Sequence, residues 1–89
     1  MKQCLLNGDR LSGADAVYDR LAAAFGFPDY FGKNPDALWD ALGDYGGELV
    51  AVAWHNAAIS KKRLGAEFDR IVAVLQRAAA TGRLTIELD

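Results

Sequence analysis

Three aspartates recur at every fourth position near the middle of the chain, as Asp36, Asp40 and Asp44. This spacing places them on one face of a helix, where each pair of like charges costs about 0.2–0.5 kcal/mol. The positive end of the helix dipole offsets that cost only for Asp36, which falls in the first turn. A column of carboxylates is often no more than a solvated face, but Trp39 and the aromatic loop at residues 29–32 adjoin this one. We interpret the stretch as a binding surface for a cationic partner.

The side chains that most enzymes and metal sites require are scarce. The chain has one histidine, His55, and one cysteine, Cys4, so it cannot assemble a metal cluster or a Cys–His pair. Its two serines do not lie in a strand–turn–helix elbow, and no glycine-rich phosphate loop is present. Asp36 and Asp40 could share acid–base work, but the sequence indicates no cleft around them. We therefore expect a protein that is not an enzyme and uses no metal or cofactor, with His55 at the surface and Cys4 buried as an inert thiol.

The charge of the chain is unevenly distributed. Residues 27–48 contain five carboxylates and only one cation, Lys33, which gives this stretch a net charge of −4. Because the whole chain carries −2, the remainder carries +2. Direct binding of nucleic acid requires a basic footprint, so this distribution argues against it and favours a basic protein partner. The one basic cluster, Lys61-Lys62-Arg63, is either a solvated loop or a weak patch for nucleic acid or an acidic partner.

The length and composition indicate one small folded domain spanning residues 1–89, since 52% of the residues are hydrophobic and 25% are charged. No apolar run approaches the roughly 20 residues that span a bilayer, and no basic-then-apolar leader precedes the first predicted strand. A single cysteine cannot form an internal disulfide, which fits a reducing compartment. We expect a cytoplasmic protein without membrane contact.

Three short apolar runs are of strand length: residues 3–6, 49–54 and 84–88. The second shows no clean alternation, which is typical of a strand covered on both faces, and the third alternates as a half-exposed edge strand does. Helical segments separate the three runs, and strands joined by helical crossovers lie parallel. We predict an α/β fold, a three-stranded parallel sheet with helices packed on its faces.

Helix start signals lie between these strands. Ser12 predicts the start of the first helix, because a serine with an acidic residue three positions later resembles a capping box. Asn34 and Pro35 predict the start of the acidic helix, since asparagine can cap free N–H groups and proline fits the first helical position. Leu38 and Leu42 are four residues apart and form its inward stripe.

The second half of the chain contains the longest predicted helix, over residues 66–80, with Glu67 on its outward face. Asn56 could cap a short helix in the ambiguous polar stretch before it. Trp54 ends an apolar strand and is predicted to lie in the core. Trp39 adjoins the inward stripe of the acidic helix, and core packing and partner contact are equally compatible with its position.

The central sequence resembles a known family at specific residues. The run PDYFG at residues 28–32, then Asn34, then DALWDAL at residues 36–42 closely match the central loop and helix of the barstar family. Members of that family are intracellular protein inhibitors of barnase-type bacterial ribonucleases. The resemblance extends to chain length and order of elements, and it implies the same sheet-and-helix architecture.

The resemblance also implies roles for individual residues. In that family the helix plugs the ribonuclease active site, where an aspartate at the Asp40 position occupies the place of the substrate phosphate. The aspartate at the Asp36 position pairs with an active-site arginine, and the tyrosine at the Tyr30 position lies over the catalytic histidine. Carboxylates suit such a site because a ribonuclease must be cationic where it binds phosphate.

We predict that this chain binds a basic, extracellular-type ribonuclease one to one and inhibits it inside the cell that makes the inhibitor, which protects that cell's RNA. The alternative is a non-inhibitory module that recruits another basic protein through the same acidic helix. A gene for a small, basic, secreted ribonuclease in the same operon or chromosome would favour the inhibitor. The predicted partner-binding residues are Tyr30, Phe31, Asn34, Asp36, Trp39, Asp40, Gly43, Asp44 and Tyr45.

The sequence departs from the family pattern at several positions. Tyr45 stands where the family has a second interface tryptophan, Lys33 replaces an acidic residue and Pro35 replaces a leucine. Gln76-Arg77 occupies the place of a glutamate that also reaches the ribonuclease. A cation there would repel a barnase-like surface, so we expect a cognate enzyme that differs from barnase and weak or absent inhibition of barnase itself.

Exchange of Arg77 for glutamate (Arg77→Glu) is expected to strengthen binding to barnase at least several-fold, because it replaces a repulsive charge with an attractive one. Titration of barnase activity with the wild-type and variant proteins measures the difference. Equal inhibition by the two would show that Arg77 does not face the enzyme.

Overall fold

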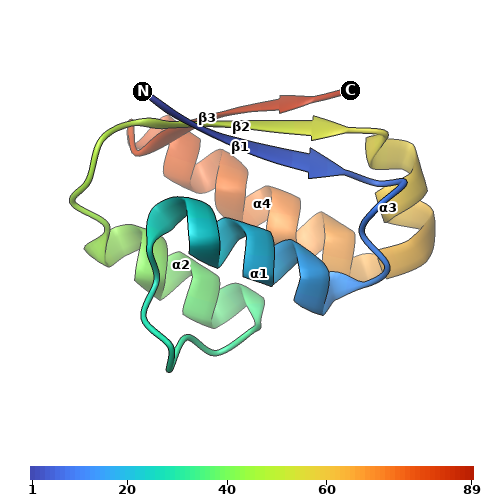
Figure 1. The fold of residues 1–89 in the computed structure, drawn as a ribbon, viewed down its shortest axis with the longest axis horizontal. Coiled ribbons are helices and arrows are strands. Elements are labelled where there is room, and N and C mark those ends of the chain that lie inside the picture. Colours follow the sequence, from blue (N-terminus) through green and yellow to red (C-terminus); the bar gives the residue numbers. More distant parts are fainter.

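The computed structural model describes all 89 residues. Three strands and four helices follow one another in the order that the sequence predicts, and the ambiguous stretch after the second strand is helical (Figure 1). The elements are β1 (Lys2–Asn7), α1 (Ala14–Phe25), α2 (Pro35–Asp44), β2 (Val50–His55), α3 (Ala57–Leu64), α4 (Ala66–Ala80) and β3 (Leu84–Leu88). None of the helices combines the length and the apolar character that crossing a membrane requires.

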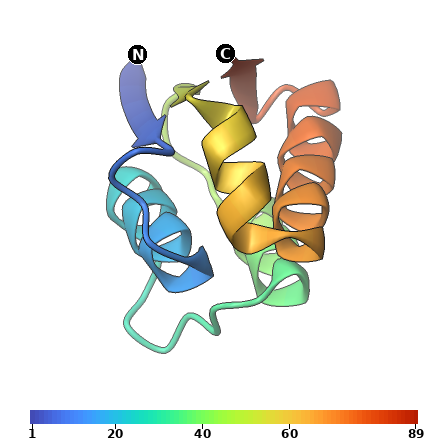
Figure 2. The ribbon, with the colours of Figure 1, turned by 90° about the vertical axis from the view of Figure 1, so that its right-hand side faces the viewer.

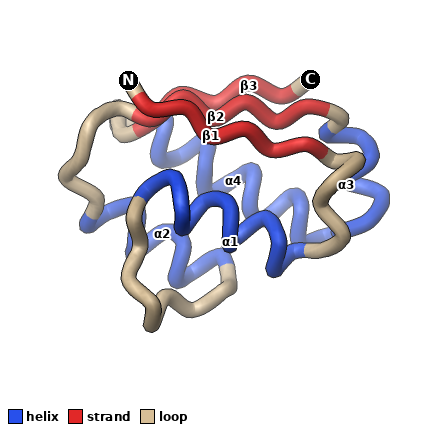
Figure 3. The backbone as a smooth tube through the Cα atoms, viewed as in Figure 1, coloured by secondary structure: helices blue, strands red, loops and turns tan.

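The three strands form one sheet in which both pairings are parallel. β2 lies at the centre between β1 and β3, and the register places Cys4 beside Val52 and Val52 beside Ile86. Helices connect the end of each strand to the start of the next, so the strands run in the same direction (Figure 3). The predicted α/β class with a three-stranded parallel sheet is confirmed, and β3 lies at an edge as predicted.

The helices cover only one face of the sheet, and the prediction that both faces are covered was wrong (Figures 1 and 2). Along β2, Val50, Val52 and Trp54 are buried, whereas Ala51 and Ala53 between them are partly exposed. On β1 the outward Leu5 is half exposed as well. The sequence does not reveal this alternation of buried and exposed positions, because the outward positions of β2 carry small apolar residues rather than polar ones.

Trp54 is fully buried in a single core of 19 buried hydrophobic residues, which confirms its predicted burial. Its indole Nε1–H donates to Oγ of Ser60 across 2.9 Å, and the edge of its ring meets Phe68 with 5.0 Å between centroids. Ser60 is the one buried polar or charged residue of the chain, and its hydroxyl accepts this hydrogen bond in the core. Cys4 is buried as predicted, and burial raises the pKa of its thiol.

Two predicted helix caps do not form. α1 begins one residue later than predicted, after Gly13, and no side chain caps it, so the proposed role of Ser12 was wrong. Asn56 precedes α3 in the left-handed conformation, with φ of 55°, and does not cap the helix either. Its side-chain amide instead donates to Oδ1 of Asn7 at the end of β1, across 2.9 Å. A contact between distant segments thus replaces the local one.

The basic cluster Lys61-Lys62-Arg63 lies in the last turn of α3, so its assignment to a loop was wrong. Lys61 forms an ion pair of 2.7 Å with Asp69, and Arg63 donates from Nη1 to the carbonyl of Gly8 across 2.8 Å. These positions also suit the negative end of the helix dipole. Two of the three cations are therefore engaged within the fold.

Replacement of Ser60 by alanine (Ser60→Ala) is expected to lower the free energy of unfolding by about 1–3 kcal/mol, because it leaves the buried Nε1–H of Trp54 without an acceptor. Ser12→Ala is the matched control, since Ser12 is exposed and outside any helix. Urea unfolding of the two variants measures the difference. A loss for Ser60→Ala no larger than that of the control would contradict the assigned role of this hydrogen bond.

Candidate partner-binding site

The start of α2 forms as the sequence predicts. Oδ1 of Asn34 accepts from the backbone N–H of Ala37 across 2.8 Å, and Pro35 occupies the first turn. Leu38 and Leu42 are fully buried and anchor the helix to the core. Because side chains leave a helix at roughly 100° intervals, these two leucines fix which residues face outward.

The remaining residues of α2 follow a definite order around the helix axis. Measured from Trp39, Asp36 lies roughly 60° round the helix, Asp40 roughly 100° and Asp44 roughly 140°. Ala37 lies beyond them, on the side of the helix away from Trp39. The carboxylates therefore form the crest of α2, between Trp39 on one flank and a strip of small residues on the other.

Trp39 is half-buried and packs against the edge of the core. The guanidinium carbon of Arg77, from α4, lies 4.3 Å from the centroid of its ring. The core interpretation of Trp39 is thus partly met, because part of its ring packs against the core. Contact between Trp39 and a partner stays a prediction.

The loop between α1 and α2 is held by stacked aromatic rings. The rings of Phe25 and Phe27 stack with 5.5 Å between centroids, and Phe27 meets Phe31 at 4.9 Å. Tyr45, just after α2, places its ring edge-on to Phe25 at 5.0 Å. Tyr30 stands at the tip of this loop and is 89% exposed. The rings beneath it hold the loop, while the side chain of Tyr30 remains exposed.

Two further contacts tie the loop to the body of the protein. Lys33 forms an ion pair of 2.8 Å with Asp19 of α1, which raises the pKa of the lysine. Tyr18, fully buried in α1, meets Phe31 edge-on with 6.1 Å between ring centroids, and its hydroxyl donates to Oε2 of Glu67 across 2.6 Å.

The predicted outward position of Glu67 was therefore wrong, because this carboxylate turns toward Tyr18 of α1. Burial and the bond to Glu67 raise the pKa of Tyr18 well above its usual range.

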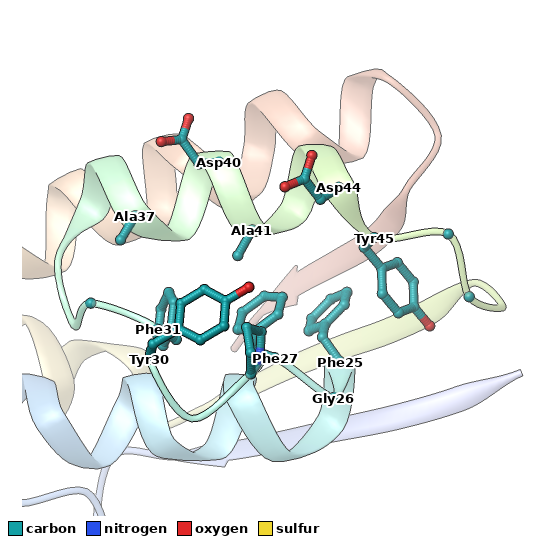
Figure 4. Close-up of a pocket in the computed structure, with 14 residues that line it drawn as sticks. Phe25, Gly26, Phe27, Tyr30, Phe31, Ala37, Asp40, Ala41, Asp44 and Tyr45 are labelled. Carbon is teal, nitrogen blue, oxygen red and sulfur yellow. The ribbon is translucent and has the colours of Figure 1, made fainter.

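A groove of about 590 Å³ lies between α2 and the aromatic loop (Figure 4). Asp40 and Asp44 border it from α2, and Tyr30 borders it from the loop. Aromatic rings and the small side chains of Ala37 and Ala41 line the interior. The expectation that no cleft accompanies these aspartates was wrong, since the alanines beside them leave the space open.

The carboxylates of this surface have no internal partners. Asp36, Asp40 and Asp44 are exposed, and none forms an ion pair or a hydrogen bond within the chain. Nearby, only Glu48 is paired, with the amino group of Met1 at 3.1 Å. Three free negative charges within two turns of one helix give this surface a strong attraction for a cationic group.

The nine predicted partner-binding residues occupy the outer surface of one region, but they do not all reach the groove. The groove is lined by Tyr30, Phe31, Asp40, Asp44 and Tyr45. The others lie around it: Asn34 caps the helix, Asp36 and Trp39 lie along its crest and far flank, and Gly43 is exposed near its end.

Sequence reasoning missed several residues that build the groove. Phe25 and Phe27 form part of its lining, and Ala37 and Ala41 make room for it. The alanines carry a readable signal, because small residues four apart beside a column of aspartates leave one side of a helix without bulk. No group of three or more histidine, cysteine, aspartate or glutamate side chains is placed to hold a metal ion, either at the groove or elsewhere.

Two comparisons with known sequences identify the family of this chain. A sequence model of the family described as "Barstar (barnase inhibitor)" matches residues 1–87. A protein of Bacillus subtilis (strain 168) named "Putative ribonuclease inhibitor YrdF" is 31% identical over 78 residues, which covers 88% of this chain and 86% of the relative. Since both matches run along nearly the whole length of the chain, and not only its central run, the chain belongs to the barstar family.

Proposed function

We propose that this protein inhibits a basic microbial ribonuclease by inserting α2 and the aromatic loop into its active site, one molecule to one. The observation that carries the proposal is the unpaired carboxylate crest of α2, with Asp40 and Asp44 bordering a groove opposite the exposed Tyr30. Family membership supports a ribonuclease as the partner.

The chemistry of the partner supports the same conclusion. A ribonuclease binds the phosphates of RNA, so its active site carries positive charge, and a carboxylate can occupy the position of a phosphate oxygen. Asp40 lies at the middle of the crest and is proposed to take this position. Asp36 would pair with an arginine beside it, and Tyr30 would cover the catalytic histidine.

The surface is held in shape before a partner arrives. The Asn34 cap and the buried leucines fix α2, while the stacked rings under Tyr30 fix the loop. The free carboxylates need not break internal ion pairs when they meet the enzyme. Both properties reduce the cost of binding, because little conformational entropy is lost and no internal bond is exchanged.

We further propose that inhibition takes place in the bacterial cytoplasm, where the inhibitor protects the RNA of the cell that makes it. The unpaired, buried Cys4 supports a reducing compartment. The function would then be immunity to a cytotoxic ribonuclease.

The blocking model is tested by competition between this protein and a nucleoside monophosphate for a ribonuclease that it inhibits. The two are expected to exclude each other, because both need the phosphate position of the active site. Association should also slow as salt rises, since charge steers the encounter. A ternary complex of enzyme, nucleotide and this protein would rule the model out.

Replacement of Asp40 by alanine (Asp40→Ala) is expected to stabilise the free protein by about 1 kcal/mol, because it removes two like-charge contacts and adds helix propensity. The same change is expected to weaken ribonuclease binding by at least about 2 kcal/mol, or about 30-fold. Denaturant unfolding measures the first effect and titration of the enzyme the second.

Glu87→Ala is the matched control for binding, since it removes the same charge from β3, outside the groove. Binding by this variant should stay within about twofold of the wild type, because its contribution is only a screened long-range one. A destabilised Asp40→Ala protein would show that Asp40 supports the fold instead, and unchanged binding would remove the main residue from the proposed interface.

A further inference from the structure

Arg77 is held in a fixed position beside the carboxylate crest. Its guanidinium lies over the ring of Trp39, with 4.3 Å between the central carbon and the ring centroid, and the arginine is exposed. Attraction between the cation and the electron-rich face of the indole restrains a side chain that would otherwise sample many rotamers. A positioned positive charge thus borders the row of negative charges on α2.

Nothing within the chain neutralises this arginine. The four ion pairs of the structure involve other residues, and Arg77 donates no hydrogen bond. The next cation on this flank, Arg83, differs in this respect, because it donates to Oγ1 of Thr81 at 2.8 Å and to the carbonyl of Gly43 at 3.5 Å. Arg77 is the cation beside α2 whose donors remain free.

The position of Arg77 over the ring of Trp39 bears on what the arginine can bind. A guanidinium uses its flat face when it stacks on an aromatic ring, while its N–H groups point outward in the plane. That arrangement leaves the edge of the group available to a planar acceptor with two oxygens. In a protein partner, this acceptor is the carboxylate of an aspartate or glutamate.

We propose that Arg77 is a second contact point for the ribonuclease, and that this enzyme carries an aspartate or glutamate beside its cationic active site. The inference rests on the proposed function and adds the chemistry of the partner. The charges on each side of the interface would then alternate in sign. The carboxylates of α2 would meet the cationic active site, and Arg77 would meet a carboxylate at the border of that site.

This alternation selects among ribonucleases. An enzyme whose whole rim is cationic would place like charges opposite Arg77 and leave its guanidinium desolvated without a counter-ion, which is costly. An enzyme with a carboxylate at that place gains a hydrogen-bonded pair and a fixed register, because each sign has one matching position. Arg77 would therefore distinguish enzymes that the aspartates alone attract equally.

The test uses a panel of purified small, basic ribonucleases of the barnase type, excluding barnase, from which an enzyme that the wild-type protein inhibits is chosen. Arg77→Met keeps an unbranched side chain on Trp39 and removes the charge. Arg77→Glu reverses the charge. Arg70→Met is the control, because Arg70 is an exposed cation on the same helix and forms no ion pair. Thermal unfolding of each variant shows whether the fold is kept.

Affinity for the chosen enzyme is expected to fall at least about tenfold in Arg77→Met and further in Arg77→Glu, mainly through faster dissociation, while Arg70→Met changes it less than about threefold. Each acidic residue that borders the enzyme's active site is also replaced by alanine. One of these replacements should weaken binding to the wild-type protein but leave binding to Arg77→Met unchanged, which identifies the partner of Arg77. Unchanged or tighter binding by Arg77→Met or Arg77→Glu would overturn this inference and leave the proposed function intact. A wild-type protein that inhibits no member of the panel would overturn the proposed function, and this inference with it.

Discussion

The burial of Leu38 and Leu42 is the constraint on which the binding surface depends. These side chains fix the rotation of α2 about its own axis, and every other residue of the helix then takes its direction from the roughly 100° step between neighbours. The aspartates become a crest, Trp39 turns toward α4, and the alanines face the aromatic loop. A rotation by one residue would expose the leucines and turn either the two alanines or Trp39 and Gly43 into the core. The packing of the core and the direction of the charges are therefore set by the same two leucines.

The features of the site that could be predicted are those governed by neighbours in sequence. The Asn34 cap, the inward leucines and the aspartate column each follow from spacings of three or four residues, and all are present. The parallel pairing followed from the alternation of strands and helices. Local rules were sufficient for the helix features because a helix start involves few residues. The parallel pairing could be predicted because strands joined by helical crossovers have a narrow choice of geometry.

What could not be predicted depends on contacts between distant segments. The hydroxyl of Tyr18 meets Glu67, which lies 49 residues further along the chain, and no periodicity in either helix indicates it. The groove is another example, since its walls come from the end of α1, the loop, α2 and the segment after it. The open face of the sheet was missed for a different reason. Its residues on β2 are alanines, and alanine occurs both in protein cores and on protein surfaces.

The parallel pairing of the sheet also bears on when the fold is completed during synthesis of the chain. No strand has its partner next to it in the sequence, since Cys4 pairs with Val52 and Val52 with Ile86, so each pairing closes a loop that contains at least one helix. Closing long loops slows folding relative to forming local hairpins. The central strand β2 gains its second neighbour only when β3 has left the ribosome. A nascent chain therefore carries the whole acidic surface before its supporting sheet is complete, and the surface takes its final shape only after β3 has been made.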